Sequence, residues 1–328
     1  MKESEPMVSE VKRCLYCYKD LSKNEIEKNM DFHPSCSKKI FETTQEPVLP
    51  YHKYEIDALA LEVVRSQTTI TGVQPKLSLN ILNETPKRFT IVGLWGRYIL
   101  KPPADAYLHL PETEDLTMHL AEVSGLPTVP HSLIRFKGGE LCYITKRIDR
   151  DKNGNKRHME DMCQLTERLT ENKYKGSYEQ IGKTIVSYSS LPGLDLIRLM
   201  EQVLFCFLTG NADMHLKNFS LIKENKTDYV LAPAYDMIAT KLILSEDLDE
   251  LALTLNGRKR KIDRGDFEAA FQTLKLDEKT GKNIFNKFET TIPLWTDWIH
   301  RSFLPEEMKE KYLEMVLERA NRMNLVAD

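Results

Sequence analysis

Three polar side chains in the middle of the chain have the types and spacing that phosphoryl transfer needs. Asp213 and Asn218 stand five residues apart in the polar segment TGNADMHLKN, and Asp236 follows the apolar run YVLAPAY. Transfer from ATP requires a carboxylate that orients and deprotonates the attacking hydroxyl, and oxygen ligands that hold Mg²⁺ against the phosphates. Asp213 can be the base, and Asn218 and Asp236 can hold the metal. Taken singly, each residue is also consistent with a turn or a helix cap.

A second candidate segment, SQTTITGVQPKLSLNI, is a hydroxyl-rich turn that runs into a strand. Gly72 allows the backbone to approach a phosphate closely, while Thr69 and Thr71 supply hydroxyl groups and Lys76 a positive charge. A loop with one glycine is equally typical of an ordinary turn before an edge strand that begins at Pro75.

One lysine ends an apolar strand farther along the chain. Lys101 closes the run RYILK just before Pro102. From the end of a sheet, a lysine can reach phosphate oxygens, as the strand lysine of protein kinases does. The alternative is a solvated side chain at the end of a strand.

Three of the six cysteines cluster near the N-terminus with a histidine. Cys14 and Cys17 are followed after fifteen residues by His33 and Cys36, which gives two ligand pairs with the spacing of a tetrahedral Cys₃His zinc site. Four protein ligands would make this zinc structural, and the metal would replace the core that about 30 residues cannot build alone. The alternative is that the cysteines are small buried hydrophobic residues and the histidine lies on the surface.

The elements that must position these residues form a β-rich part followed by an α-rich part. The β-rich part has one helical stretch, at Glu114–Ser124, among strand-like runs: PKLSLNIL, RFTIVGLW, RYILKP, HSLIRF and ELCYITKRI. Beyond it, apolar residues recur with helical spacing, as they do in Leu194–Leu208 and Tyr312–Ala320. The fold class predicted from these patterns is α+β, divided into a zinc module at 10–45, a β-rich domain at 46–150 and an α-helical domain at 151–328.

Composition excludes several classes of protein. The 328 residues carry 46 Lys and Arg against 49 Asp and Glu, a net charge of −3, which argues against a dominant nucleic-acid surface. The segment MKESEPMVSEVK has no apolar stretch, and no later run approaches the roughly 20 apolar residues of a membrane span. We therefore expect a cytoplasmic protein that does not enter a membrane and whose cysteines are not disulfide-bonded.

The motifs TITGVQPKLSL, YILKP, RIDRD, TGNADMHLKNFSL and LAPAYD, in this order, resemble those of the HipA family of serine/threonine protein kinases, the toxins of toxin–antitoxin operons. The chain looks most similar to the short, HipT-like variety, in which the N-terminal subdomain of the family is missing, with the zinc module added. The resemblance implies a two-lobed protein-kinase-like fold with a β-rich small lobe and a helical large lobe.

The resemblance also implies roles for individual residues. Asp213 would be the catalytic base, and Asn218 and Asp236 the Mg²⁺ ligands. Two hydroxyls in the phosphate loop would be autophosphorylation candidates, Thr69 and Thr71. The remaining matched residues would contact ATP in the phosphate loop, at the strand lysine, along the hinge and beside the catalytic motifs: Thr71, Gly72, Val73, Gln74, Pro75, Lys76, Lys101, Lys146, Arg147, Ile148, His215 and Tyr235.

Partners implied by the resemblance are a helix-turn-helix antitoxin, which alone would read DNA, and a separate small protein equivalent to the missing subdomain. The implied substrate is a translation-related protein such as an aminoacyl-tRNA synthetase, free or tRNA-bound, and its phosphorylation would arrest growth. Two alternatives stay open: a non-catalytic scaffold that binds nucleotide or antitoxin, and a small-molecule kinase of the same fold.

A calcium-loop pattern competes with this interpretation between the two parts of the chain. Asp149, Asp151, Asn153, Gly154 and Glu160 match the EF-hand consensus. The preceding segment reads as a strand rather than a helix, and basic residues interrupt the loop. We therefore expect a polar turn.

Overall fold

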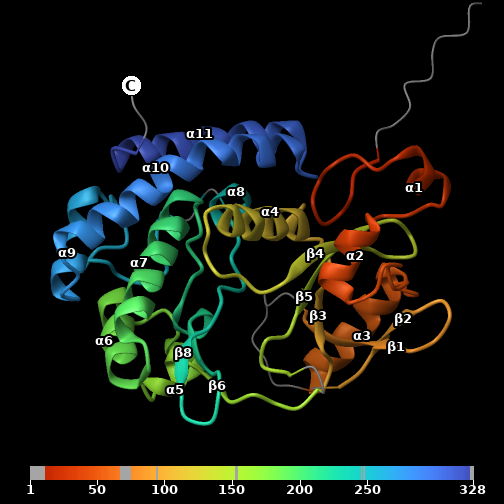
Figure 1. Cartoon of the computed structure of the whole chain (residues 1–328), viewed down its shortest axis with the longest axis horizontal. Coiled ribbons are helices and arrows are strands. Elements are labelled where there is room, and N and C mark those ends of the chain that lie inside the picture. The colour runs from red at the N-terminus through yellow and green to blue at the C-terminus, as the bar shows by residue number, and fades with distance from the viewer. Residues whose placement is uncertain are drawn as a thin grey trace, which may run out of the picture.

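The computed structural model describes residues 12–66, 75–93, 95–151, 154–244, 246 and 248–325, with the backbone alone for 60–66. Two lobes lie side by side in Figure 1, a sheet-containing lobe and a larger helical lobe. Among the described residues three helices come first, and after them a strand-rich part precedes a helical part, as the sequence predicts.

The small lobe is built on an antiparallel five-stranded sheet with the order β2-β1-β3-β5-β4. Its central strand places Leu100 opposite Leu77 on one side and Ile144 on the other, and all three side chains lie in the core or at its edge. Each of the five predicted strand runs contains one of these strands: β1 (Leu77–Leu82), β2 (Arg88–Ile91), β3 (Tyr98–Lys101), β4 (His131–Arg135) and β5 (Leu141–Lys146).

The N-terminal segment packs on this sheet and shares its core. Phe32 and Phe41 stack edge to face, and Phe41 continues the aromatic series to Phe89 and Tyr98 of the sheet, with ring centroids 5.3–5.6 Å apart from one ring to the next along this series. The backbone of Val48 extends the sheet beside β2, because its N–H donates to the Lys87 carbonyl oxygen at 2.9 Å. The helices of this segment are α1 (Lys23–Glu27), α2 (Pro34–Phe41) and α3 (Lys53–Ser66). The sequence patterns did not predict α3.

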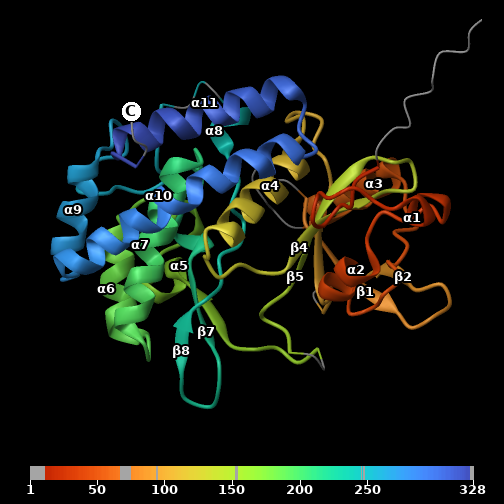
Figure 2. The same cartoon turned by 45° about the horizontal axis from the view of Figure 1, so that its top comes forward.

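Helix α4 (Leu110–Val123) lies between the lobes (Figures 1 and 2). It packs on β4 and β5 of the small lobe and on α10 of the large lobe. Trp295 of α10 donates a hydrogen bond from Nε1 to Ser124 Oγ at the end of α4, at 2.9 Å. The predicted helical stretch therefore exists, and it begins four residues earlier than expected.

The large lobe is a helical core with a small three-stranded sheet, β6-β7-β8, at the side facing the small lobe. Helix α7 is buried on most sides, and α10 wraps its apolar face around it through Phe288 and Trp295, which pack on Phe205. Both helical patterns predicted for this lobe are helices. Its elements are β6 (Met159–Asp161), α5 (Met162–Leu165), η1 (Thr170–Asn172), α6 (Tyr178–Tyr188), α7 (Pro192–Leu208), η2 (Leu216–Asn218), β7 (Ser220–Lys223), β8 (Tyr229–Leu231), α8 (Thr240–Ile243), α9 (Arg264–Thr273), α10 (Glu278–Arg301) and α11 (Glu306–Arg322).

None of the helices in the described part of the chain has the length and hydrophobicity that crossing a bilayer would demand.

Candidate active site

A cavity of about 1380 Å³ lies between the small-lobe sheet, α4 and the loops around β7 and β8. It is lined by all the described residues that the sequence analysis assigned to nucleotide, Mg²⁺ or catalysis: Pro75, Lys76, Lys101, Lys146, Arg147, Ile148, Asp213, His215, Asn218, Tyr235 and Asp236. The other candidates of the phosphate loop, Thr69, Thr71, Gly72, Val73 and Gln74, lie outside the described residues. Segments that are up to 160 residues apart in sequence thus meet at one cavity, while the roles of these residues stay predictions.

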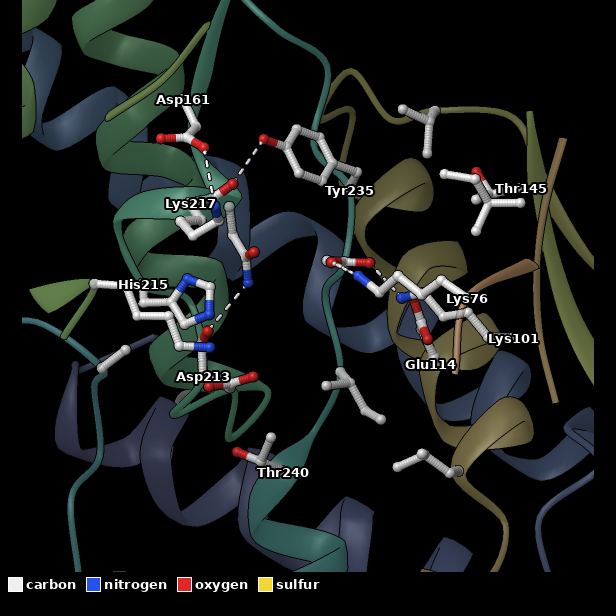
Figure 3. A pocket seen from close by; sticks show the side chains of 18 of the residues that line it. Lys76, Lys101, Glu114, Thr145, Asp161, Asp213, His215, Lys217, Tyr235 and Thr240 are labelled. Carbon is white, nitrogen blue, oxygen red and sulfur yellow. Dashed lines mark hydrogen bonds and ion pairs between the residues drawn. The ribbon is translucent and has the colours of Figure 1, made fainter. Parts of the chain in front are cut away.

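Lys101 is the centre of a charged cluster on one side of the cavity. Its side chain is only 5% exposed, which rules out the alternative of a solvated lysine at a strand end. The ammonium group contacts two carboxylates, Glu114 of α4 and Asp236 after β8. The Lys76 ammonium reaches the second oxygen of Asp236 at 2.6 Å. Figure 3 shows Lys76, Lys101 and Glu114 together, across the pocket from Asp213 and His215.

Three charged groups set one another's protonation: the buried Lys101 and Glu114 and the partly buried Asp236. Burial would lower the pKa of Lys101, but Asp236 and Glu114 hold it above the usual lysine value. Burial would likewise raise the pKa of Asp236, but Lys101 and Lys76 hold it well below the usual range. For Glu114 burial prevails over the attraction of Lys101 and raises the pKa to about 7. At neutral pH the cluster therefore holds a charged lysine, a charged aspartate and a glutamate close to its titration midpoint.

Asp213 lies in a tight loop that its own backbone organises. The Asp213 carbonyl oxygen accepts hydrogen bonds from the His215 N–H at 2.8 Å and from Asn218 Nδ2 at 3.1 Å. The carboxylate itself accepts a hydrogen bond from the Tyr174 hydroxyl. Because the Asn218 amide nitrogen is engaged, its carbonyl oxygen is the atom suited to a cation. The D-x-x-x-x-N spacing thus has a structural reason, since Asn218 closes the loop that presents Asp213.

His215 is buried beside this base. Burial lowers the pKa of His215 to about 4, so the imidazole is neutral at physiological pH. Its Nδ1 is a buried atom that has no hydrogen-bond partner among the described residues, and its ring lies edge-on to Tyr174 at 5.0 Å. A neutral ring at this place adds no charge next to Asp213.

The backbone holds Asp236 in a special conformation. Its φ of 57° lies in the left-handed region, which an aspartate adopts more readily than most residues. The preceding Tyr235 donates a hydrogen bond to the Lys217 carbonyl oxygen at 3.1 Å, which ties this segment to the Asp213 loop. Asp236 does not cap a helix, because the N-cap of the following α8 is Ala239. The helix-cap alternative is therefore wrong for Asp236.

The predicted hinge leaves β5 along the edge of the cavity. The Arg147 guanidinium holds both carboxylate oxygens of Asp149, at 2.8 and 2.7 Å, and the Lys146 ammonium contacts Glu42. Asp149 is thus paired with arginine, and the element before it is a strand. The described part of the segment is a turn, because the Asp151 N–H donates to the Asn155 carbonyl oxygen at 2.9 Å and the Gly154 N–H to the Asp151 carbonyl oxygen at 3.0 Å; Asn153 lies outside the described residues.

The predicted zinc ligands converge at the N-terminal segment. The ligand atoms of Cys14, Cys17, His33 and Cys36 all lie within 4.8 Å of one another. His33 Nδ1 lies 3.4 Å from Cys17 Sγ and 3.9 Å from Cys36 Sγ, close to the separation of about 3.5–3.8 Å that tetrahedral Zn–S and Zn–N bonds imply. His33 Nε2 faces the Asp20 carbonyl oxygen at 3.2 Å, which can only accept. The proton therefore belongs on Nε2, and Nδ1 has a lone pair for a metal.

Comparison with known proteins identifies the family. The sequence profile of the HipA-like C-terminal domain matches residues 68–295, more than half of the chain. The chain belongs to this HipA-like family. The match spans the charged cluster, the Asp213 loop and the hinge, while the Cys₃His cluster precedes it.

Relatives of this HipA-like chain carry kinase names. A Haemophilus influenzae protein named "Putative kinase" is 29% identical over 81% of this chain and 78% of its own length. The serine/threonine-protein kinase toxin HipA of Shewanella oneidensis is 27% identical over 58% of this chain and 47% of its own length, so the chain spans about half of that relative.

Two solved structures share the fold. The Shewanella oneidensis HipA in complex with HipB and operator DNA superposes with a TM-score of 0.69 at 22% identity, covering 84% of this chain and 72% of that one. The Helicobacter pylori proinflammatory kinase CtkA reaches a TM-score of 0.50 at 16% identity, over 72% of this chain and 89% of CtkA. The fold of this HipA-like chain is therefore kinase-like, with mixed helix and sheet.

Sequence reasoning missed two residues of the site in this HipA-like chain. Glu114 is the buried partner of Lys101, and Tyr174 is the hydrogen-bond donor to Asp213. A signal existed for Glu114, because it and Asp115 are adjacent acidic residues at the start of the helical stretch that the sequence predicts. Tyr174 lies in a loop without periodicity, and no sequence pattern identifies it.

Proposed function

We propose that this protein is an ATP-dependent serine/threonine protein kinase that serves as the toxin of a HipA-type toxin–antitoxin pair. The observation that carries the proposal is Lys101, buried between Glu114 and Asp236 in the same cavity as Asp213 and Asn218. In protein kinases a strand lysine that pairs with a helix glutamate contacts the ATP phosphates, and a nearby aspartate holds the metal.

The side chains divide the reaction between them. Asp213 accepts the proton of a serine or threonine hydroxyl, whose oxygen forms a bond to the γ-phosphorus. The bond from that phosphorus to the β,γ-bridging oxygen breaks, and ADP leaves. Lys101 and Lys76 exchange the Asp236 carboxylate for phosphate oxygens and offset the charge that gathers there. Positioning and charge are the main sources of rate in such a transfer.

The donor set fits Mg²⁺. Asn218 offers an amide oxygen and Asp236 a carboxylate that stays ionised, and Mg²⁺ prefers both kinds of ligand. When bound with ATP, the ion would neutralise the phosphate oxygens. The hinge residues Lys146–Ile148 would lie along the adenine, and the loop 71–76 would cover the phosphates, with Thr69 or Thr71 open to autophosphorylation. A phosphate there would add roughly 1.5 to 2 negative charges beside those of ATP and repel it.

The proposed cellular role follows from the similarity to the toxin HipA. Because that relative is a toxin kinase crystallised with HipB and operator DNA, we propose a helix-turn-helix antitoxin as partner. The proposed substrate is a translation-related protein such as an aminoacyl-tRNA synthetase, free or tRNA-bound. A short HipT-like organisation would add a separate small subdomain protein.

The Cys₃His cluster is proposed to bind one structural zinc. Its four donor atoms lie within 4.8 Å of one another, and the second nitrogen of His33 faces a carbonyl oxygen. With four protein ligands, no position stays open for a substrate. The metal would therefore stabilise the N-terminal segment on the small-lobe sheet.

Labelled ATP separates the proposal from its alternatives. Wild-type protein and Asp213→Asn are incubated with [γ-³²P]ATP, Mg²⁺ and a cell lysate, and label is followed on proteins and on small molecules. Label on proteins with the wild type alone supports the proposal. Label on metabolites would indicate a small-molecule kinase, and no label at all a non-catalytic scaffold. Mass spectrometry of the 67–76 peptide tests autophosphorylation of Thr69 and Thr71 in the same samples.

A further inference from the structure

The turn formed by residues 14–19, which we call the N-terminal knuckle, inserts one side chain into the core of the large lobe. Tyr18 directly follows Cys17, and its ring is fully buried among residues of the large-lobe core. The neighbouring Cys14 and Leu15 belong instead to the small-lobe core. Tyr18 therefore links the two cores from within the knuckle.

The knuckle fixes Tyr18 in an unusual conformation. Its φ of 60° lies in the left-handed region, which is uncommon for a bulky residue. The turn holds it there, because the Tyr18 N–H donates to the Cys14 carbonyl oxygen at 3.0 Å and the Cys14 N–H to the Lys19 carbonyl oxygen at 2.9 Å. A strained residue persists only when its surroundings determine it. The proposed metal would hold Cys14 and Cys17 and so this turn.

The Tyr18 hydroxyl forms a hydrogen bond with a residue of α4. It donates a buried hydrogen bond to Asp115 Oδ2 at 2.7 Å, and the ring packs against His119, Trp298 and Phe303 with centroids 5.0–5.4 Å away. Burial would raise the pKa of Asp115, but the neighbouring His119 and His131 hold it at about 2. The acceptor is thus a carboxylate, which makes the hydrogen bond stronger than one between neutral groups.

Asp115 immediately follows the partner of Lys101. Successive residues of an α-helix are about 100° apart, so a constraint on Asp115 fixes the rotation of α4 and hence the direction of Glu114. A second route runs from Asp115 to His131 Nδ1 at 2.8 Å, and from the His131 ring to Tyr143, which lies 5.3 Å beneath the Lys101 ammonium. Both routes from Tyr18 end at the Lys101–Glu114 pair.

We propose that Tyr18 is a positioning residue for phosphoryl transfer, which holds α4 through Asp115 so that Glu114 meets Lys101. The N-terminal knuckle is then part of the active-site assembly and not only a cover for the small lobe. This inference rests on the proposed kinase function. It means that the activity of that site depends on the knuckle being folded.

Tyr18→Phe tests the inference, because it removes the hydroxyl and keeps the ring. Tyr16→Phe is the matched control, since it removes the hydroxyl of another knuckle tyrosine that makes no hydrogen bond among the described residues. We expect kcat to fall about tenfold in Tyr18→Phe, with a smaller change in the KM for ATP. Within the described part of the chain, the buried Asp115 Oδ2 loses its 2.7 Å hydrogen bond and keeps only His119 Nε2 at 3.5 Å, a loss large enough to displace α4. Tyr16→Phe should retain the wild-type kcat.

A double-mutant cycle with Glu114→Gln separates positioning from general destabilisation. If Tyr18 acts through Glu114, Tyr18→Phe has little further effect on kcat in the Glu114→Gln background. An equal loss in both backgrounds, or an unchanged kcat in Tyr18→Phe, would overturn the inference while the kinase activity stands.

Amide hydrogen exchange gives a readout that needs no activity. Exchange in residues 110–123 should be faster in Tyr18→Phe than in the wild type and in Tyr16→Phe. If the wild type transfers no phosphate, the proposed function fails, and the hold of Tyr18 on α4 is decided by exchange alone. Unchanged exchange in that segment would overturn it.

Discussion

Glu114→Gln is expected to make the protein more stable and less active at the same time. Burial raises the pKa of Glu114 to about 7, from 4.5 in an unfolded chain. A folded-state pKa above the unfolded value means that stability from this group is fully present below pH 4.5 and is lost as the pH rises through 7. The rise in the pKa of Glu114 from 4.5 to about 7 corresponds to roughly 3 kcal/mol of lost stability at high pH. Glutamine keeps the shape of the protonated acid and avoids this loss.

The size of the gain should depend on pH. From the same two pKa values, the stabilisation by Glu114→Gln is about 1 kcal/mol at pH 5 and about 3 kcal/mol at pH 8. Urea denaturation of both proteins between pH 5 and 8, without nucleotide, measures the free energy of unfolding. Glu307→Gln serves as the control, because Glu307 is an exposed helix glutamate that pairs with Lys311, a partner that stays charged between pH 5 and 8. Its difference from the wild type should not grow with pH.

Activity should change in the opposite direction. Phosphoryl transfer needs the charged Glu114 to orient Lys101, so kcat of the wild type should rise with pH through about 7. In Glu114→Gln, kcat should be lower by at least about tenfold and should lack that rise. A Glu114→Gln protein less stable than the wild type at pH 8 would show that the ionised glutamate stabilises the cluster, and the electrostatic reasoning would be wrong.

Three further substitutions test the other parts of the site. Asp213→Asn should lower phosphoryl transfer by on the order of 10³-fold and leave ATP affinity nearly unchanged, as measured by calorimetry, because the amide cannot accept the hydroxyl proton. Lys101→Met should weaken ATP binding by at least about tenfold in the same titration, because a buried cation that faces the phosphates is lost. Cys17→Ser should reduce bound zinc from one per chain to none by atomic emission, whereas Cys142→Ser, in the buried strand β5, should keep the metal. Zinc retained by Cys17→Ser would contradict the Cys₃His assignment.

The sequence was most informative where contiguous residues alone determine the local structure. Strands of four to six apolar residues between turns, and the helical spacing of Leu194–Leu208, are properties of contiguous residues, and the structure has elements at these places. The spacing of Asp213 and Asn218 was also local, because the asparagine amide binds the aspartate carbonyl oxygen five residues away. Patterns of this kind need no knowledge of the tertiary fold.

Contacts between residues far apart in the sequence could not be predicted from local patterns. Lys101 and Asp236 are 135 residues apart, and a lysine at a strand end is usually solvated, so its burial depends on α4 covering it. Helix α3 was missed although Ile56, Leu59 and Val63 recur at helical spacing, because its segment lies between two prolines and a series of strand-like runs. The N-terminal segment looked like a separate unit, since its link holds Pro47 and Pro50, whereas Val48 in that link adds to the sheet beside β2.

The charged cluster balances its own charges around Asp236. Each carboxylate oxygen of Asp236 faces one ammonium group, from Lys101 and from Lys76. A divalent cation alone would have to displace these lysines and leave Lys101 buried with only Glu114, a group that is half protonated near pH 7. A triphosphate supplies the negative charge that the lysines would lose. In the proposed mechanism the metal therefore arrives with ATP, and Asp236 becomes a metal ligand only when the phosphates have taken over its two lysines.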